Sequence, residues 1–292
     1  MNKAIRATAM ALVLAWMLVA PGLAQTVELE PETLSAFDRY VGQAERRMVD
    51  ELHAGGSFLL PDGWSAERRD QTYLRLRRGE MAIENLGQGP EAQVPHGMVH
   101  HWAAIVFVPS ATLDQALALI QDYDRHQNVY SPEVLRSRLL QRQGDDFHIF
   151  LRLRKHKVRT VVLDTEYDVH FARLDSRRAY SRSHSTRIAE VEHPGERGER
   201  DLLPGKDHGF LWALDTYWRF REAEDGVFIQ CEAISLTRDV PPGLGWLVGP
   251  FVESIPRESL EFTLAATRKA VTMRQAAVAG VQIKETQDVR AK

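Results

Sequence analysis

Alternation of apolar and polar residues dominates the middle of this chain. In segments 147–154 and 161–171, large apolar side chains alternate with histidine, arginine and carboxylates. Segments 210–220 and 227–233 repeat the pattern, and segment 179–189 has a serine at every second position near its start. A period of two places one face of a strand toward an interior and the other toward water. Each segment is therefore predicted to be a half-buried β-strand.

Helical spacing appears on both sides of this strand-rich stretch. A strand at Met98–Val108 is followed by Leu113–Ile120, whose apolar positions recur at i, i+3, i+4 and i+7, with Ser110 as the predicted helix cap. After Pro132 the chain returns to strand. A long helix is predicted at Phe251–Val278, with a polar tail at 281–292.

The region before the main domain, residues 25–95, has its own pattern. Residues 32–53 carry apolar side chains at helical spacing and end at a glycine pair. Tyr73–Leu76 and Met81–Ile83 flank Arg78-Gly79, which predicts a short hairpin. Gly87–Pro95 is typical of a linker. Because this region has few apolar residues, it is expected to pack on the main domain rather than to fold alone.

The order of elements between residues 96 and 280 predicts an α+β protein. We expect the helix-grip fold, a curved antiparallel sheet of about seven strands wrapped around a long C-terminal helix. Such a sheet commonly encloses an apolar cavity.

This layout resembles the START-like, or SRPBCC, superfamily from about Gly97 to Val278. The resemblance rests on element order, on Gly209-Phe-Leu-Trp before Tyr217-Trp218, and on Arg238-Asp239-Val240-Pro241 before the long helix. Pro256–Leu260 also resembles the start of that helix in exported bacterial members. The resemblance implies binding of sterols, phospholipids, polyketides or other apolar ligands, although some members are cyclases or hydrolases. It brings no short catalytic motif with it.

The first 24 residues are typical of a secretory signal peptide. Lys3 and Arg6 precede the uncharged apolar run Ala7–Ala20, and Gly22-Leu23-Ala24 places small residues at a cleavage site. The run is shorter than the roughly 20 residues that a membrane-spanning helix needs. We expect export to the periplasm or the exterior; an uncleaved N-terminal anchor is the alternative.

Charge and cysteine content narrow the function classes. The formal net charge of −3 lacks the basic excess of a nucleic-acid-binding protein. The single cysteine, Cys231, excludes an intramolecular disulfide. His96, His100 and His101 lie on a predicted strand, where residues four apart are separated by about 13 Å, too far to share one ion. We therefore expect no metal site and no cofactor.

The apolar face of the strands is the candidate ligand site. Ser181, Ser183 and Ser185 share one face of their strand, and a turn near Asp175 would bring them beside Tyr167. Such hydroxyls would orient a ligand in an otherwise apolar cavity, whereas packing against the final helix is the simpler role for each apolar residue. The predicted ligand-binding residues are Leu151, Leu163, Tyr167, Ser183, Trp212, Leu214, Trp218 and Ile229.

Two surface features suggest a membrane. Basic residues crowd the hairpin tip between Arg152 and Arg159, which indicates either a solvated turn or peripheral contact with anionic lipid. The segment Val240–Phe251 places apolar residues among glycine and proline. It could gate a cavity, enter a membrane interface, or tuck under the final helix.

No catalytic residues are predicted. Ser183, His184 and Ser185 are strand neighbours, so their side chains alternate between faces and His184 cannot activate either serine. Tyr167 and His184 would form an acid–base pair only if both faced the cavity. The leading hypothesis is a non-catalytic carrier of an apolar, lipid-like molecule. The alternatives are a cyclase, dehydratase or hydrolase using the same cavity, and an envelope protein-interaction module.

Overall fold

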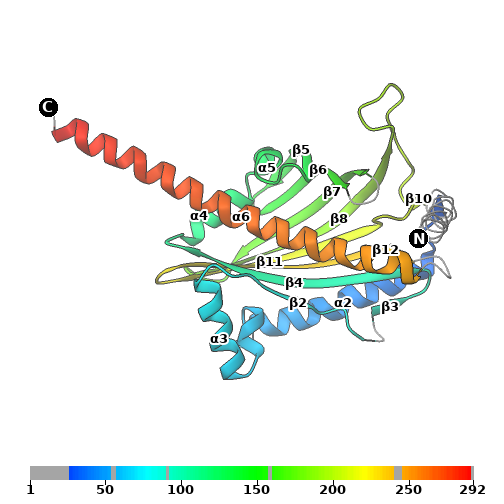
Figure 1. The fold of residues 1–292 in the computed structure, drawn as a ribbon, viewed down its shortest axis with the longest axis horizontal. Helices are drawn as coiled ribbons and strands as arrows, with labels where there is room; N and C mark the ends of the chain where they lie inside the picture. Colours follow the sequence, from blue (N-terminus) through cyan, green and yellow to red (C-terminus); the bar gives the residue numbers. More distant parts are fainter. Residues whose placement is uncertain (1–25, 54–56, 90–91, 157–159, 240–244, 291–292) are drawn as a thin grey trace, which may run out of the picture.

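The computed structural model describes residues 26–53, 57–89, 92–156, 160–239 and 245–290, with a large antiparallel sheet at its centre (Figure 1). Within these residues ten strands form that sheet, and eight of them follow one path in the order β2-β4-β12-β11-β8-β7-β6-β5. The strands of that path are β2 Ala82–Asn85, β4 Gly97–Pro109, β5 Val134–Gln143, β6 Asp146–His156, β7 Thr160–Arg173, β8 Arg178–Glu192, β11 Ala213–Ala223 and β12 Gly226–Arg238.

Four short strands complete the described β-structure. β3 (Gln93–Val94) pairs with β4, and β9 (Arg200–Asp201) pairs with β8. β1 (Val27–Glu28) and β10 (Lys206–Asp207) form a separate two-stranded sheet, which joins the start of the described chain to the loop before β11.

The long helix α6 (Gly245–Arg290) lies across one face of the sheet, which we call the inner face (Figure 1). Its backbone runs closest to β4, and it also contacts β12, α4 (Leu113–Ile120) and α5 (His126–Val129). The fold is therefore α+β with a sheet gripping a C-terminal helix, as the sequence predicts. α6 begins before Phe251 and continues past Val278, so the predicted tail is helical as far as Arg290.

The main core lies between the inner face and the helices α4 and α6. It includes Leu260, Leu264 and Val271 of α6, which are at most 4% exposed. On the sheet side it is continuous from Val106 on β4 to Phe147 on β6. Burial of this apolar surface is the main source of stability for the grip.

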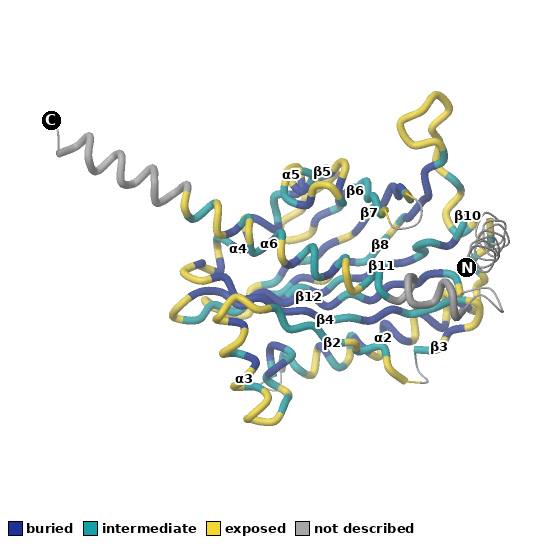
Figure 2. Tube along the Cα trace, in the orientation of Figure 1, coloured by how far each residue is buried: buried dark blue, intermediate teal, exposed yellow. Residues whose placement is uncertain are grey.

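The opposite, outer face of β4, β12 and β11 is covered by the N-terminal region. The helix α2 (Pro31–His53) packs Phe37, Tyr40 and Met48 against strand residues such as Ile234. The one-turn helix η1 (Leu60–Gly63) and α3 (Ala66–Arg77) close a further cluster around Phe228. β4 and β12 lie between α2 and α6, and they are the most continuously buried strands (Figure 2).

A buried polar network ties α2 to the sheet. Glu232 of β12 is 1% exposed and accepts hydrogen bonds from Arg47 and from His101 Nε2, the latter at 2.6 Å. Tyr40 Oη lies 2.7 Å from the other ring nitrogen of His101. The basic partners lower the pKa of Glu232 even though burial opposes its charge. His101 is therefore a structural residue of this interface.

The predicted hairpin at residues 73–83 is wrong. Tyr73–Leu76 lies inside α3, and Ala82 begins a strand that pairs with β4. The segment 66–77 lacks β-branched residues apart from Thr72, and most of its residues are arginine, leucine, alanine, glutamate or glutamine, which favour helix. Leu76, only 1% exposed, anchors this helix against the outer face.

Two smaller differences concern the ends of elements. Thr112, not Ser110, caps α4, since its side chain accepts from the Gln115 amide. The predicted linker contains the short strand β3.

The predicted signal peptide lies outside the described residues. Among the described helices, none combines the length and hydropathy required to cross a membrane.

Candidate ligand-binding site

The strand register places the predicted serines on the inner face. Ser181 pairs with Phe171 and Trp218, and both of these belong to or pack on the inner core. Ser185 pairs with Tyr167. Since directly paired residues share a face of the sheet, hydroxyl groups from β7 and β8 point toward the same side as α6.

Along the first part of β11, the residues that point away from α6 are more buried than those that point toward it. The outer residues Ala213, Asp215 and Tyr217 are buried, whereas the inner residues Leu214, Thr216 and Trp218 are partly exposed; further along the strand the inner Phe220 is buried again. The cause is coverage, because α2 seals the outer face of β11 while α6 runs closest to β4 and α4. We call the half-buried inner residues the open inner face; they are Leu151, Ser185, Leu214, Thr216 and Trp218.

Two buried hydroxyls next to the open inner face have no hydrogen-bond partner within the described part of the chain: Tyr167 Oη and Ser181 Oγ. Burial raises the pKa of Tyr167 to about 12, so its hydroxyl stays neutral. Most buried polar groups in proteins are paired. A ligand or a water molecule that reached these two hydroxyls would supply the missing hydrogen bonds.

Ser185 and Thr165 complete this polar lining with bonds of their own. Ser185 Oγ accepts from the Leu214 amide at 3.0 Å, and its own hydroxyl hydrogen is not used in that bond. Thr165 Oγ1 donates to the Leu151 carbonyl at 2.8 Å. The centre of the inner face thus offers neutral hydroxyls among apolar side chains.

A carboxylate lies at one end of the inner face, and sequence reasoning missed it. Glu190 is 4% exposed, and its partner in the register is Leu163, which shares a face of β7 with Tyr167. Its carboxylate lies 2.6 Å from His208 Nδ1 and accepts from the amides of His208 and Phe210. A bulge at Thr186 shifts the alternation of β8, and strict alternation would have placed Glu190 outside.

Asp207 lies beside this pair. It is fully buried, and its Oδ1 accepts from the Gly209 amide at 2.7 Å and from Trp212 Nε1 at 3.0 Å. Burial and the nearby Glu190 raise the pKa of Asp207 to about 6. Its Oδ2 has no partner within the described residues.

The structure separates the predicted ligand-binding residues into three groups. Tyr167, Ser183 and Ile229 are buried on the inner face, and Leu163 is buried near the Glu190 end. The remaining inner residues are Leu151, Leu214 and Trp218, which belong to the open inner face.

Trp212 does not belong to this site. It precedes the first residue of β11, so the alternation of the strand does not extend to it. Its ring packs on the outer cluster with α2. The prediction that Trp212 lines the inner face with Leu214 is therefore wrong.

The hypothetical acid–base pair of Tyr167 and His184 is also excluded. His184 lies on the outer face of the sheet, 3.3 Å from Asp215 and 3.2 Å from Glu45 of α2. These carboxylates raise the pKa of His184, Asp215 being the main cause. Tyr167 and His184 point to opposite faces.

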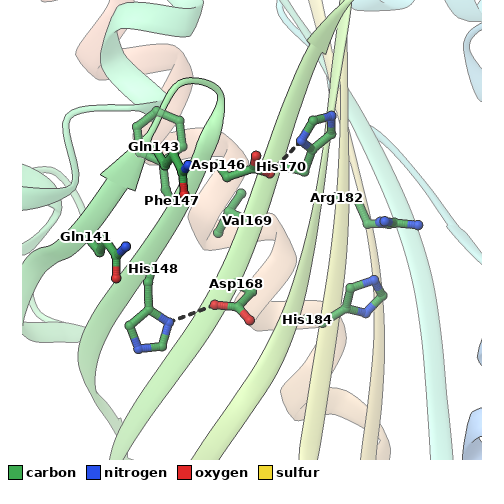
Figure 3. A pocket seen from close by; sticks show the side chains of 10 residues that line it. All are labelled: Gln141, Gln143, Asp146, Phe147, His148, Asp168, Val169, His170, Arg182 and His184. Carbon is green, nitrogen blue, oxygen red and sulfur yellow. Dashed lines mark hydrogen bonds and ion pairs between the residues drawn. The ribbon is translucent and has the colours of Figure 1, made fainter.

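An outer hollow of about 550 Å³ occupies the side of β5–β8 that α2 leaves uncovered (Figure 3). Histidine–aspartate pairs line it: His148 Nδ1 is 2.8 Å from Asp168, and His170 Nδ1 is 2.7 Å from Asp146. Among the described residues, no group of three or more such side chains is arranged to hold a metal ion. The hollow is open to solvent, and Phe147 and Val169 line it together with the polar side chains.

The basic tip is partly neutralised. Arg152 forms ion pairs with Asp164 and Glu199, and Lys155 pairs with Glu133. Residues 157–159 lie outside the described part of the chain, as do residues 240–244 of the predicted gate. The side chains of residues 245–251 are likewise not described.

No known family profile and no curated protein matches the chain. Several solved structures are similar to it. A STAR-related lipid transfer protein from Xanthomonas axonopodis is 16% identical over 65% of this chain and 98% of that chain, with a TM-score of 0.43. Human STARD10 is 10% identical over 74% and 85%, with a TM-score of 0.41. The di-domain aromatase/cyclase StfQ of the steffimycin pathway is 13% identical over 61% and 52%, also at 0.41.

Proposed function

We propose that this protein binds a neutral, largely apolar small molecule on its open inner face, without chemical transformation. The observation that carries the proposal is the partial exposure of Leu214, Thr216 and Trp218 on the side of β11 that faces α6. Leaving apolar side chains partly exposed next to a packed core forgoes some stability. A bound apolar molecule would recover that burial.

The polar groups of the site specify the kind of ligand. Tyr167 Oη and Ser181 Oγ lack partners within the described residues, and Ser185 has a free hydroxyl hydrogen. All three are neutral, so they fit a hydroxyl or carbonyl group rather than a charged headgroup. A lipid-like molecule with one or two such oxygen atoms matches this lining.

The test is organic extraction of purified protein followed by mass spectrometry, made in parallel on Leu214→Arg. The wild-type protein is expected to carry a stoichiometric apolar molecule, and the variant to carry at most a small fraction of it. Leu203→Arg is the matched control, because Leu203 is 70% exposed in the loop between β9 and β10 and is not one of the residues of the open inner face. Equal recovery from all three proteins contradicts the assignment of the site.

A protein that is empty after mild purification favours the second candidate, an enzyme that releases its product. The observation behind that candidate is the Glu190–His208 pair, in which the carboxylate holds Nδ1 and leaves Nε2 available for proton transfer. In that case His208→Gln, added to a screen of ester hydrolysis and dehydration, would abolish turnover and leave folding intact.

We further propose that the chain is exported, on the basis of residues 1–24 alone. Expression with a mass measurement of the mature protein tests this. Cleavage after Ala24 is expected, and an intact N-terminus in the cytoplasmic fraction would contradict export.

A further inference from the structure

The edge strand β5 exposes two leucines through two irregularities in its pairing. Its register with β6 shifts between Val134 and Arg136, and again between Leu139 and Gln141. Leu135 and Leu140 are the residues without a partner, and they are 41% and 40% exposed. Bulges re-aim side chains and are commonly functional, so the outward leucines need an explanation.

Arginines accompany these leucines. Arg136 and Arg138 are exposed and alternate along β5, and neither forms an ion pair or a side-chain hydrogen bond within the described residues. By contrast, Arg152, which pairs with Arg136 across the strands, is held by Asp164 and Glu199. On this acidic protein, the edge thus displays two cations that no carboxylate of the described residues neutralises.

The edge is not available to an added strand. The amide of Ser137 donates to Gln127 Oε1 at 3.1 Å, and that of Leu139 donates to Asp124 Oδ1 at 2.9 Å. Asp124 belongs to the one-turn helix η3 (Tyr123–Arg125), and Gln127 belongs to α5. Since β-augmentation requires free backbone groups, what the edge offers to a partner is its side chains.

We propose that the β5 edge is a docking surface for a membrane that contains anionic phospholipid. Exposed leucines suit the apolar boundary of a bilayer, and neighbouring arginines suit its phosphate groups. An overall net charge of −3 argues against a nucleic-acid surface, which would need a broader basic excess. β5 is the edge strand next to β6. In the order of the sheet, five other strands separate it from β4, the strand closest to α6.

The docking surface is separate from the proposed ligand site. Leu135, Arg136, Arg138 and Leu140 make no part of the open inner face, and docking needs no bound ligand. Leu214→Arg, which is expected to lose the ligand, should therefore keep its membrane binding. A failure of one proposal leaves the other standing, and the two readouts differ.

The experiment is co-sedimentation of the full mature chain with vesicles of phosphatidylcholine alone or with about one third phosphatidylglycerol. Each arginine near an anionic surface contributes about 1 kcal/mol, so R136Q/R138Q should lower the partition coefficient on anionic vesicles about 30-fold. R39Q/R46Q removes the same charge from exposed positions of α2 and should bind like wild type.

Vesicle binding at high salt, and vesicle binding of a variant without the leucines, give a second test on folded protein. Raising the salt to about 0.5 M should abolish most of the arginine contribution. L135S/L140S should weaken binding at both low and high salt. Equal binding of wild type and R136Q/R138Q, or binding that ignores both lipid charge and salt, overturns the proposal. Binding to a DNA oligomer without binding to vesicles overturns it in favour of a nucleic acid.

Discussion

At the scale of single residues, the inner face is defined by what its hydroxyls lack. Tyr130 and Tyr167 are both buried tyrosines near the core, but Tyr130 Oη lies 3.0 Å from Thr267 Oγ1 whereas Tyr167 Oη has no partner among the described residues. A buried polar group without a partner costs free energy that a partnered one does not. The Tyr130 hydroxyl therefore stabilises the fold, whereas the Tyr167 hydroxyl remains for a ligand.

Replacement by phenylalanine tests this distinction. Tyr167→Phe removes an unpaired group, so the free energy of unfolding should stay within about 0.5 kcal/mol or increase, while ligand recovery falls. Tyr130→Phe should lose about 1 kcal/mol because its hydrogen bond with Thr267 is removed, although Thr267 keeps its bond to the Thr263 carbonyl. Thermal unfolding of ligand-free protein measures both. A larger loss in Tyr167→Phe than in Tyr130→Phe would show that the Tyr167 hydroxyl already has a structural partner.

At the scale of elements, sequence periodicity predicts the strands that face the core and fails where the backbone leaves its regular period. The strands at 98–108, 147–154 and 161–171 follow their patterns closely. The bulge at Thr186 reverses the side of Glu190, and no residue type at that position indicates it. The prediction of the site consequently included the serines and Tyr167 but missed the carboxylate.

The bulges of β5 show the same limit. Leu135 and Leu140 would be assigned by alternation to one face or the other, yet both lie outside the pairing altogether. In the N-terminal region, residues 73–76 are ambiguous between strand and helix because an apolar–basic alternation of four residues fits both. The helix-favouring composition of residues 66–77 and the packing of Leu76 on the outer face decide for helix.

The loop that joins β10 to β11 contains a pH-dependent contact. Because the pKa of Asp207 is about 6 in the folded protein against 3.8 ordinarily, the folded state keeps a proton that the unfolded chain has lost. This contribution to stability is complete below about pH 4 and decreases as the pH rises to about 6.

Asp207→Asn should therefore gain stability relative to wild type between about pH 5 and pH 7, by about 1–2 kcal/mol once solvent screening is allowed for. Melting temperatures of both proteins across this range measure the effect, and the comparison cancels titration of the other groups. A constant difference between the two proteins would mean that Asp207 does not titrate there.

At the scale of the whole molecule, the sheet has a core on each face, and the two cores depend on one another. β12 contributes Ile229 and Cys231 to the inner core and Ile234 and Leu236 to the cluster under α2. The part-buried contact of Arg47 with the buried Glu232 crosses the same interface. The N-terminal region is therefore expected to unfold together with the grip rather than before it.

Phe37→Ala tests this coupling. Phe37 of α2 is 2% exposed, so its truncation should cost about 3–5 kcal/mol and lower the midpoint of a single unfolding transition. Leu34→Ala, on the same helix but 40% exposed, should change the free energy of unfolding by less than about 0.5 kcal/mol. Far-ultraviolet circular dichroism and tryptophan fluorescence, which includes Trp218 of the inner face, should report coincident transitions in both variants. If Phe37→Ala instead produced an early phase with unchanged fluorescence, α2 would be a separately melting cover, and the half-burial of β11 would have to be explained without it.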